Sequence, residues 1–157
     1  MNISLICIGK TDEKPLEELI SKYEKRLPPN WNYQRIEIPD LKNRKNLSET
    51  QQKEKEAELI FAKINPNEFI ILLDERGKQL NSVKFANQIQ ELMNQSVRQL
   101  TFLIGGPYGF SDEVYKRANL KLSLSEMTFT HQMVRLFMTE QLYRAFSILQ
   151  GKSYHHE

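Results

Sequence analysis

The chain has few cysteines, no long apolar run and little net charge, and each shortage excludes a class of protein. Its 157 residues include a single cysteine, Cys7, so no intramolecular disulfide can form. Because Cys7 lies in an apolar run from Ile3 to Ile8, we expect a buried structural thiol. No apolar stretch approaches the roughly 20 residues that cross a bilayer, and the N-terminus lacks the charged-then-apolar order of a secretion signal. We therefore expect a cytoplasmic protein with no membrane partner.

Histidines are also scarce, which bears on metal binding. The three in the chain form neither a His-Glu-x-x-His motif nor a combination with Cys-x-x-Cys. His155 and His156 are adjacent, but two neighbouring histidines do not make up a ligand set. The sequence therefore predicts no metal site.

The formal net charge of +2 is too small for the whole surface to attract nucleic acid without specificity. The distribution is uneven, because the stretch from Lys116 to Lys152 contains six basic and two acidic residues, an excess of +4. This pattern indicates either a positive end of the molecule or an ordinary solvated face with scattered cations. The basic residues are Lys116, Arg117, Lys121, Arg135, Arg144 and Lys152.

Apolar periodicity predicts alternating strands and helices in one domain, residues 1–157. Short apolar or alternating runs predict strands at residues 2–8, 33–38, 69–73, 100–104 and 120–124. Helical spacing predicts helices at about 15–27, 48–64, 82–94, 111–117 and 130–150. This order is typical of the α/β class with a mainly parallel sheet flanked by helices.

Several polar residues and glycines mark the ends of these elements. Ser48 and Gln51 have the spacing of a capping box. Ser82 is expected to cap the following helix, and Gly77 to mark a turn. Gly151 is expected to stop the last helix.

Three unusual segments follow predicted strands, at the edge of the sheet where ligands of open α/β folds collect. They begin after Leu73, Ile104 and Leu124 and read DERGK, GGPYG and SEMTFTH. The paired glycines tolerate positive φ angles, so the second segment is either a ligand loop or a tight turn. The third segment suits a flat adenine between apolar walls, or is simply a strand end that leads into a helix.

The last helix carries two further signals. His131 and Arg135 lie one turn apart near its start, beside the three segments, where they either bind an anion or are ordinary surface groups. Apolar residues occur on more than one side of this helix, which predicts a subunit interface in addition to a domain core.

Taken together and in this order, these segments resemble one family over nearly the whole chain. The matching stretches are residues 6–10, 22–26, 73–78, 102–109, 122–129, 131–135, 140–145 and 154–155. They are similar to the ribosomal RNA large subunit methyltransferase H family of the SPOUT superfamily. The combination is highly specific, although no single motif is.

This resemblance implies a SPOUT fold with a C-terminal trefoil knot, a rare exception among folded chains. It implies a homodimer that binds S-adenosylmethionine and methylates N3 of a pseudouridine in a stem-loop of 23S rRNA within the assembled ribosome. The implied cofactor-binding residues are Leu73, Gly105, Leu124, Ser125, Glu126, Met127, Thr128 and Phe129. Thr130 and His156 depart from the proline and arginine common in relatives, so a phosphate contact at position 156 is in doubt.

Transfer to pseudouridine N3 requires loss of the imide proton, and four residues are candidates for catalysis. His131 or His155 is a candidate base, and Arg135 could stabilise the imide anion. Tyr154 offers an aromatic face to an unpaired base, unless the C-terminal tail is a disordered end. Two other functions stay open: a SPOUT enzyme for another RNA position, or a ribosome-binding factor without catalysis.

Overall fold

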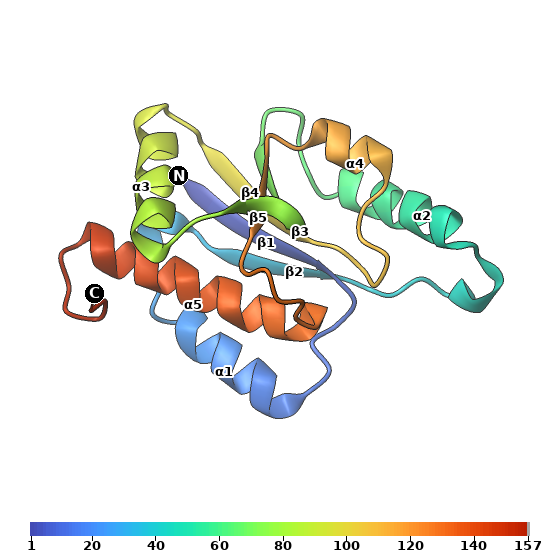
Figure 1. Cartoon of the computed structure of the whole chain (residues 1–157), viewed down its shortest axis with the longest axis horizontal. Coiled ribbons are helices and arrows are strands. Elements are labelled where there is room, and N and C mark those ends of the chain that lie inside the picture. Colours follow the sequence, from blue (N-terminus) through green and yellow to red (C-terminus); the bar gives the residue numbers. More distant parts are fainter. Residues whose placement is uncertain (157) are drawn as a thin grey trace.

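Five parallel strands form one sheet in the order β2-β1-β4-β3-β5 in the computed structural model, which describes residues 1–156 (Figure 1). The strands are β1 (Asn2–Ile8), β2 (Gln34–Ile38), β3 (Phe69–Gln79), β4 (Gln99–Ile104) and β5 (Leu120–Ser123). The predicted α/β class is therefore confirmed, and β1, β4 and β3 occupy the centre of the sheet.

Each strand is followed by an α-helix of the same number, and the helices form two layers. They are α1 (Lys14–Glu24), α2 (Glu49–Phe61), α3 (Ser82–Asn94), α4 (Asp112–Arg117) and α5 (His131–Leu149), with short 3₁₀ turns at Pro29–Trp31 and Arg44–Asn46. Figure 1 shows α1, α3 and α5 over one face of the sheet and α2 and α4 over the other. The layering gives the sheet two hydrophobic faces, as parallel sheets require.

Alternation along the strands divides the apolar residues between two cores. In β1, Leu5 and Cys7 face α3 and α5, whereas Ile6 and Ile8 face α2 and α4. Cys7 is buried as expected, and this burial raises the pKa of its thiol to about 12.

Most of the expected helix ends are confirmed, with one exception. Ser48 Oγ accepts from the Gln51 amide and Gln51 Oε1 accepts from the Ser48 amide, the reciprocal contacts of a capping box. The cap of α3 is Asn81 and not Ser82. Ser82 instead begins the helix, and its hydroxyl donates to Gln141 Oε1 of α5 at 2.8 Å. Both residues are good caps, so only the backbone conformation distinguishes them.

Gly77 lies within β3 and not in a separate turn, which corrects the sequence prediction. Leu122 of β5 pairs with both Leu73 and Lys78 of β3, so the intervening residues deviate from the ladder. A Cβ atom at Gly77 would lie 2.6 Å from the backbone of Leu122. Glycine is required here because β3 passes directly against β5. The C-terminal trefoil knot stays a prediction from the family resemblance.

A buried arginine fixes α5 against the carboxyl ends of β1 and β2. The Arg135 side chain is 0% exposed. Its Nη2 donates to the Ile8 carbonyl oxygen at 2.8 Å, and its Nη1 donates to Thr11 Oγ1 and Glu37 Oε2 at 3.0 Å each. Close by, Gln132 Nε2 donates to the Lys10 carbonyl oxygen at 2.9 Å. The first turns of α5 are thus bonded to β1, β2 and the loop after β1.

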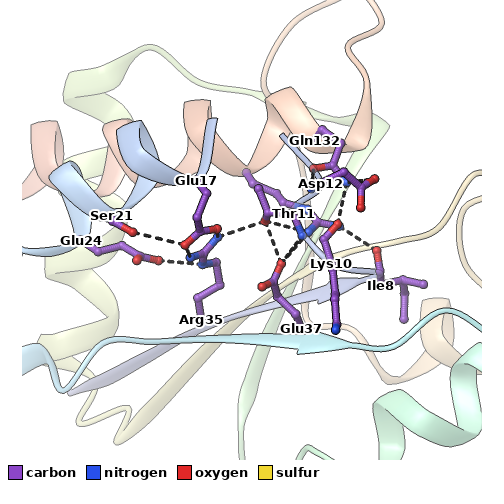
Figure 2. Close-up of polar contacts among 11 residues, drawn as sticks. Ile8, Lys10, Thr11, Asp12, Glu17, Ser21, Glu24, Arg35, Glu37 and Gln132 are labelled. Carbon is purple, nitrogen blue, oxygen red and sulfur yellow. Dashed lines mark hydrogen bonds and ion pairs between the residues drawn. The ribbon is translucent and has the colours of Figure 1, made fainter. Parts of the chain in front are cut away.

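A second arginine extends this network to α1 (Figure 2). Arg35 Nη1 donates to Glu17 Oε2 at 2.7 Å and to Thr11 Oγ1 at 3.0 Å, and Arg35 Nε lies 3.0 Å from Glu24 Oε1. Its hydrogen bonds to Glu17 lower the pKa of that carboxyl. Glu37 Oε2 also accepts from the Thr11 hydroxyl at 2.7 Å. One hydrogen-bonded network therefore joins α1, β2, the β1–α1 loop and α5.

We expect Arg135→Met to lower the free energy of unfolding by about 3 kcal/mol, because it leaves the partly buried Glu37 carboxylate without its cation. Urea denaturation followed by circular dichroism measures the change. The matched control is Arg44→Met, which breaks an ion pair with Asp40 whose two side chains are about half exposed. That loss should cost less than about 1 kcal/mol. Equal effects of the two substitutions would contradict a stabilising role for the buried network.

Candidate functional site

A cavity of about 550 Å³ lies at the carboxyl ends of β3, β4 and β5. The three segments singled out in the sequence all contribute to its walls, so residues more than 30 positions apart in sequence meet here. Seven of the eight implied cofactor residues line it: Leu73, Gly105, Leu124, Ser125, Met127, Thr128 and Phe129. Glu126 is exposed and lies outside the lining.

The glycines of the β4–α4 loop allow close packing, and only the last one has a positive φ angle. Gly109 has φ of +78°, whereas Gly105 and Gly106 do not use the positive φ angles that glycine tolerates. A Cβ atom at Gly105 would lie 3.2 Å from the Gly109 carbonyl oxygen, and one at Gly106 would lie 2.8 Å from a carboxyl oxygen of Glu56. The Gly109 amide donates to the Gly106 carbonyl oxygen at 3.1 Å. Side chains at these positions would therefore crowd the loop itself and Glu56.

The segment after β5 forms the opposite wall. Ser123 Oγ donates to the Ser125 carbonyl oxygen at 2.8 Å, and Ser125 Oγ accepts from the Met127 amide at 3.0 Å. These bonds fold the segment back while the Met127 side chain stays 75% exposed. Phe129 packs on Phe137 of α5 with ring centroids 4.9 Å apart. The wall therefore combines apolar side chains with a tightly turned backbone, as an adenine pocket would require.

A polar cluster on the β3 side of the cavity was missed by sequence reasoning. The Tyr115 hydroxyl of α4 donates to Asp74, and Arg76 Nη2 donates to the Tyr115 hydroxyl at 2.8 Å. Burial opposes ionisation of Asp74, but the hydrogen bonds that it accepts from Tyr115 and from the Arg76 amide outweigh burial and lower the pKa of the carboxyl. The DERGK segment signalled Asp74 and Arg76, but no local pattern connects them with Tyr115, about 40 residues later.

His131 lies where α5 begins and lines the cavity. Burial and the nearby Arg135 cation lower the pKa of its imidazole below the usual 6.5, so the neutral form predominates at pH 7. Thr130 precedes His131 and is the N-cap of α5. Its Oγ1 accepts from the Met133 amide at 3.2 Å. A neutral histidine in a cavity wall can accept a proton.

Arg135 lies behind this wall and does not line the cavity. Its guanidinium is fully buried and bonded to Ile8, Thr11 and Glu37, so it is not a surface group, and it does not reach the cavity in which an anion would bind. Arg135 affects the cavity only electrostatically, because its positive charge lowers the pKa of His131.

Tyr154 and His155 of the C-terminal tail are docked against residues 140–144 of α5. The Tyr154 hydroxyl donates to Glu140 Oε1 at 3.1 Å, and its ring packs edge-on against Tyr143 with centroids 4.7 Å apart. Arg144 Nη1 contacts His155 Nδ1 at 3.3 Å. Of the predicted tail, Glu157 lies outside the described residues.

The structure does not bring the two groups of predicted catalytic residues together within one chain. Helix α5 contains 19 residues between His131 and Leu149. At 1.5 Å per residue its ends are about 27 Å apart. The tail contacts residues 140–144 of this helix, so His131 lies beside the cavity, whereas Tyr154 and His155 are held about 14 to 20 Å farther along the helix axis.

The six cations of the C-terminal third do not together form a positive surface. The interpretation of this third as a positive end of the molecule is therefore corrected. Arg117 donates to three backbone carbonyl oxygens of residues 65–68, Arg135 is buried, and Arg144 pairs with Glu140 at 2.5 Å. Half of the six basic residues thus stabilise the fold.

Two kinds of feature are absent from residues 1–156. None of the helices in this part of the chain is both long and apolar enough to cross a membrane. Over the same residues, no three side chains of the His, Cys, Asp or Glu types are grouped so that they could hold a metal ion.

Comparison with known proteins identifies the family. Residues 1–155 match the family described as "Predicted SPOUT methyltransferase". A protein of Flavobacterium psychrophilum named ribosomal RNA large subunit methyltransferase H is 59% identical over 100% of both chains. Proteins of the same name from Christiangramia forsetii and Parabacteroides distasonis are 58% identical over 99% of both chains and 50% identical over 100% of both. The chain therefore belongs to the SPOUT methyltransferases and, within them, to the ribosomal RNA large subunit methyltransferase H family.

Proposed function

We propose that this methyltransferase transfers a methyl group from S-adenosylmethionine to N3 of a pseudouridine in 23S rRNA within the assembled ribosome. The observation that carries the proposal is the cavity at the ends of β3, β4 and β5, in a chain that matches large-subunit rRNA methyltransferases along its whole length. A ribosomal substrate places the activity in the cytoplasm.

The residues around the cavity fit this cofactor. A volume of about 550 Å³ lies within the usual range for small-molecule sites. The turned segment from Leu124 to Phe129 offers backbone groups and apolar walls to an adenine, and Leu73 and Gly105 close the other sides. When bound, the cofactor supplies a methyl group already activated on a sulfonium. The protein must then align the reacting atoms and exclude water.

His131 is the base that the geometry favours. In the proposed step, the neutral imidazole takes the proton from N3, and the lone pair left on N3 forms the bond to the methyl carbon while the carbon–sulfur bond breaks. His131 would leave the step as an imidazolium, which carries the positive charge that the methyl donor loses, so the charges balance. The lowered pKa of His131 keeps it unprotonated at pH 7, as a base must be.

A homodimer would complete the site. Because the tail is held about 14 to 20 Å from His131 along the axis of α5, we infer that Tyr154 and His155 serve the cavity of a partner chain. Exposed apolar side chains at the near end of α5, Met127, Phe129 and Met133, provide a surface that a partner can cover. Each site would then combine the cavity of one chain with the tail of the other.

Transfer of labelled methyl from S-adenosylmethionine to intact ribosomes, free large subunits and tRNA tests the proposal, with nucleoside identification after digestion. We expect label in N3-methylpseudouridine and only with ribosomes. Label in tRNA or in another nucleoside would assign the enzyme to a different RNA position. Cofactor binding without transfer to any RNA would indicate a non-catalytic ribosome-binding factor.

The pH dependence of transfer tests His131. Since its pKa is lowered below 6.5, the activity should fall only on the acid side of pH 6.5 and be constant from pH 7 to 9. His131→Gln should remove the acidic limb and lower the plateau by about 10²-fold or more. A rate that rises through pH 9 in both proteins would show that hydroxide removes the proton and that His131 is no base.

Mixed dimers test whether the tail acts on the partner. A chain with His131→Ala keeps its tail, and a chain truncated after Ser153 keeps His131, so each homodimer should be inactive. After subunit exchange at equal amounts, about a quarter of wild-type turnover should return, because half of the dimers then hold one complete site. Unchanged activity of the truncated homodimer, or no recovery on mixing, would refute a site shared between chains.

A further inference from the structure

A second hollow of about 430 Å³ lies beside the cofactor cavity, at the carboxyl ends of β1, β2 and β4. Pro107, Tyr108 and His131 line both spaces, so the loop after β4 and the start of α5 form a common wall. The lining of this hollow is more polar than the lining of the cofactor cavity. The charged residues in its lining are Lys10, Asp12, Asp40, Arg44 and Lys45.

The backbone of this hollow is held in place by specific contacts. Gly9 has φ of +81°, and a Cβ atom there would lie 3.0 Å from a carboxyl oxygen of Asp40, so only glycine fits. The Gly9 amide donates to the Ile38 carbonyl oxygen at 2.6 Å. The side chain of Gln132 donates a hydrogen bond to the backbone carbonyl of Lys10, and both residues are labelled in Figure 2. Lys10 is thus attached to a fixed backbone.

Cations outnumber anions at this surface by three to two. Lys10 and Lys45 are exposed, and neither has an ion-pair partner in the part of the chain that the structure describes. Arg44 pairs with Asp40 at 3.2 Å, with both side chains about half exposed. Unlike Arg117 and Arg135, these cations point to solvent and can contact phosphate oxygens.

An aromatic ring borders the cations. Tyr108 is 46% exposed at the tip of the loop after β4. An exposed ring beside a basic hollow is the usual platform for an unpaired base. His131 lies on the same wall, so a base stacked on Tyr108 would have its edge next to the proposed proton acceptor and the cofactor cavity.

We propose that this hollow binds the target nucleotide of the RNA, with Tyr108 stacking on a base and Lys10 and Lys45 contacting the phosphates that flank it. The inference rests on the proposed function and adds the RNA-binding side of the site. The carboxyl edge of the sheet is then divided, with the cofactor over β3, β4 and β5 and the RNA over β2, β1 and β4.

The test compares Lys10→Gln/Lys45→Gln with a matched control, Lys63→Gln/Lys84→Gln. The control removes the same charge from two exposed lysines that line neither the hollow nor the cofactor cavity. Each protein is assayed for cofactor affinity, for the KM and kcat of methyl transfer to intact ribosomes, and for ribosome binding over a range of KCl concentrations. Tyr108→Leu and Tyr108→Phe are assayed alongside.

Loss of the two phosphate contacts should raise the KM for ribosomes by about tenfold and reduce the slope of log affinity against log salt by about 2, with unchanged cofactor affinity. The control should behave as wild type. Tyr108→Leu should raise KM by about tenfold, and Tyr108→Phe should restore it because the ring is retained.

Equal ribosome affinity and salt slope in the double variant and its control would overturn the RNA-binding role of the hollow, even if wild-type transfer is normal. A wild-type protein that transfers no methyl group to any RNA would instead overturn the proposed function. In that case the salt-dependent binding measurements still decide for or against the hollow, since they need no catalysis.

Discussion

The buried guanidinium of Arg135 is the contact on which the arrangement of the site depends. It binds the end of β1 through Ile8, the following loop through Thr11 and the end of β2 through Glu37. A cation removed from water is costly unless it is paired and hydrogen-bonded. The guanidinium of Arg135 can therefore reach its hydrogen-bond partners only when the first turns of α5 lie against these three segments. That position places His131 between the two hollows.

The strand order explains why two ligands can meet at one edge. The central β4 has β3 and β5 on one side and β1 and β2 on the other. Its glycine loop consequently contributes to both spaces, with Gly105 toward the cofactor cavity and Tyr108 on the wall common to both. Ligand sites of open α/β sheets form where neighbouring loops diverge in this way. Methyl transfer needs such a junction, because donor and acceptor must approach from opposite sides.

Helix α5 separates His131 from Tyr154 and His155, although the proposed reaction needs all three residues at one site. The tail is stabilised by Glu140, Tyr143 and Arg144, about 14 to 20 Å along the helix axis from His131. These contacts hold Tyr154 and His155 as a preformed unit, which costs less entropy on binding than ordering a free end. A dimer is the simplest arrangement in which such a unit reaches a cavity from which its own chain holds it away.

The sequence by itself determined the alternation of strands and helices, the capping box at Ser48 and the three strand ends that line the cavity, because these follow from local periodicity and capping chemistry. The family resemblance supplied the chemistry to expect there. Only the tertiary structure decided that Gly77 makes a close strand contact and that Arg135 is buried. It also decided that Lys10 and Lys45 are the cations of the second hollow without an ion-pair partner within residues 1–156. The physical reason is that the state of a charge depends on its partners in space: Glu37 and Arg135 are 98 residues apart in the chain, and no local pattern connects them.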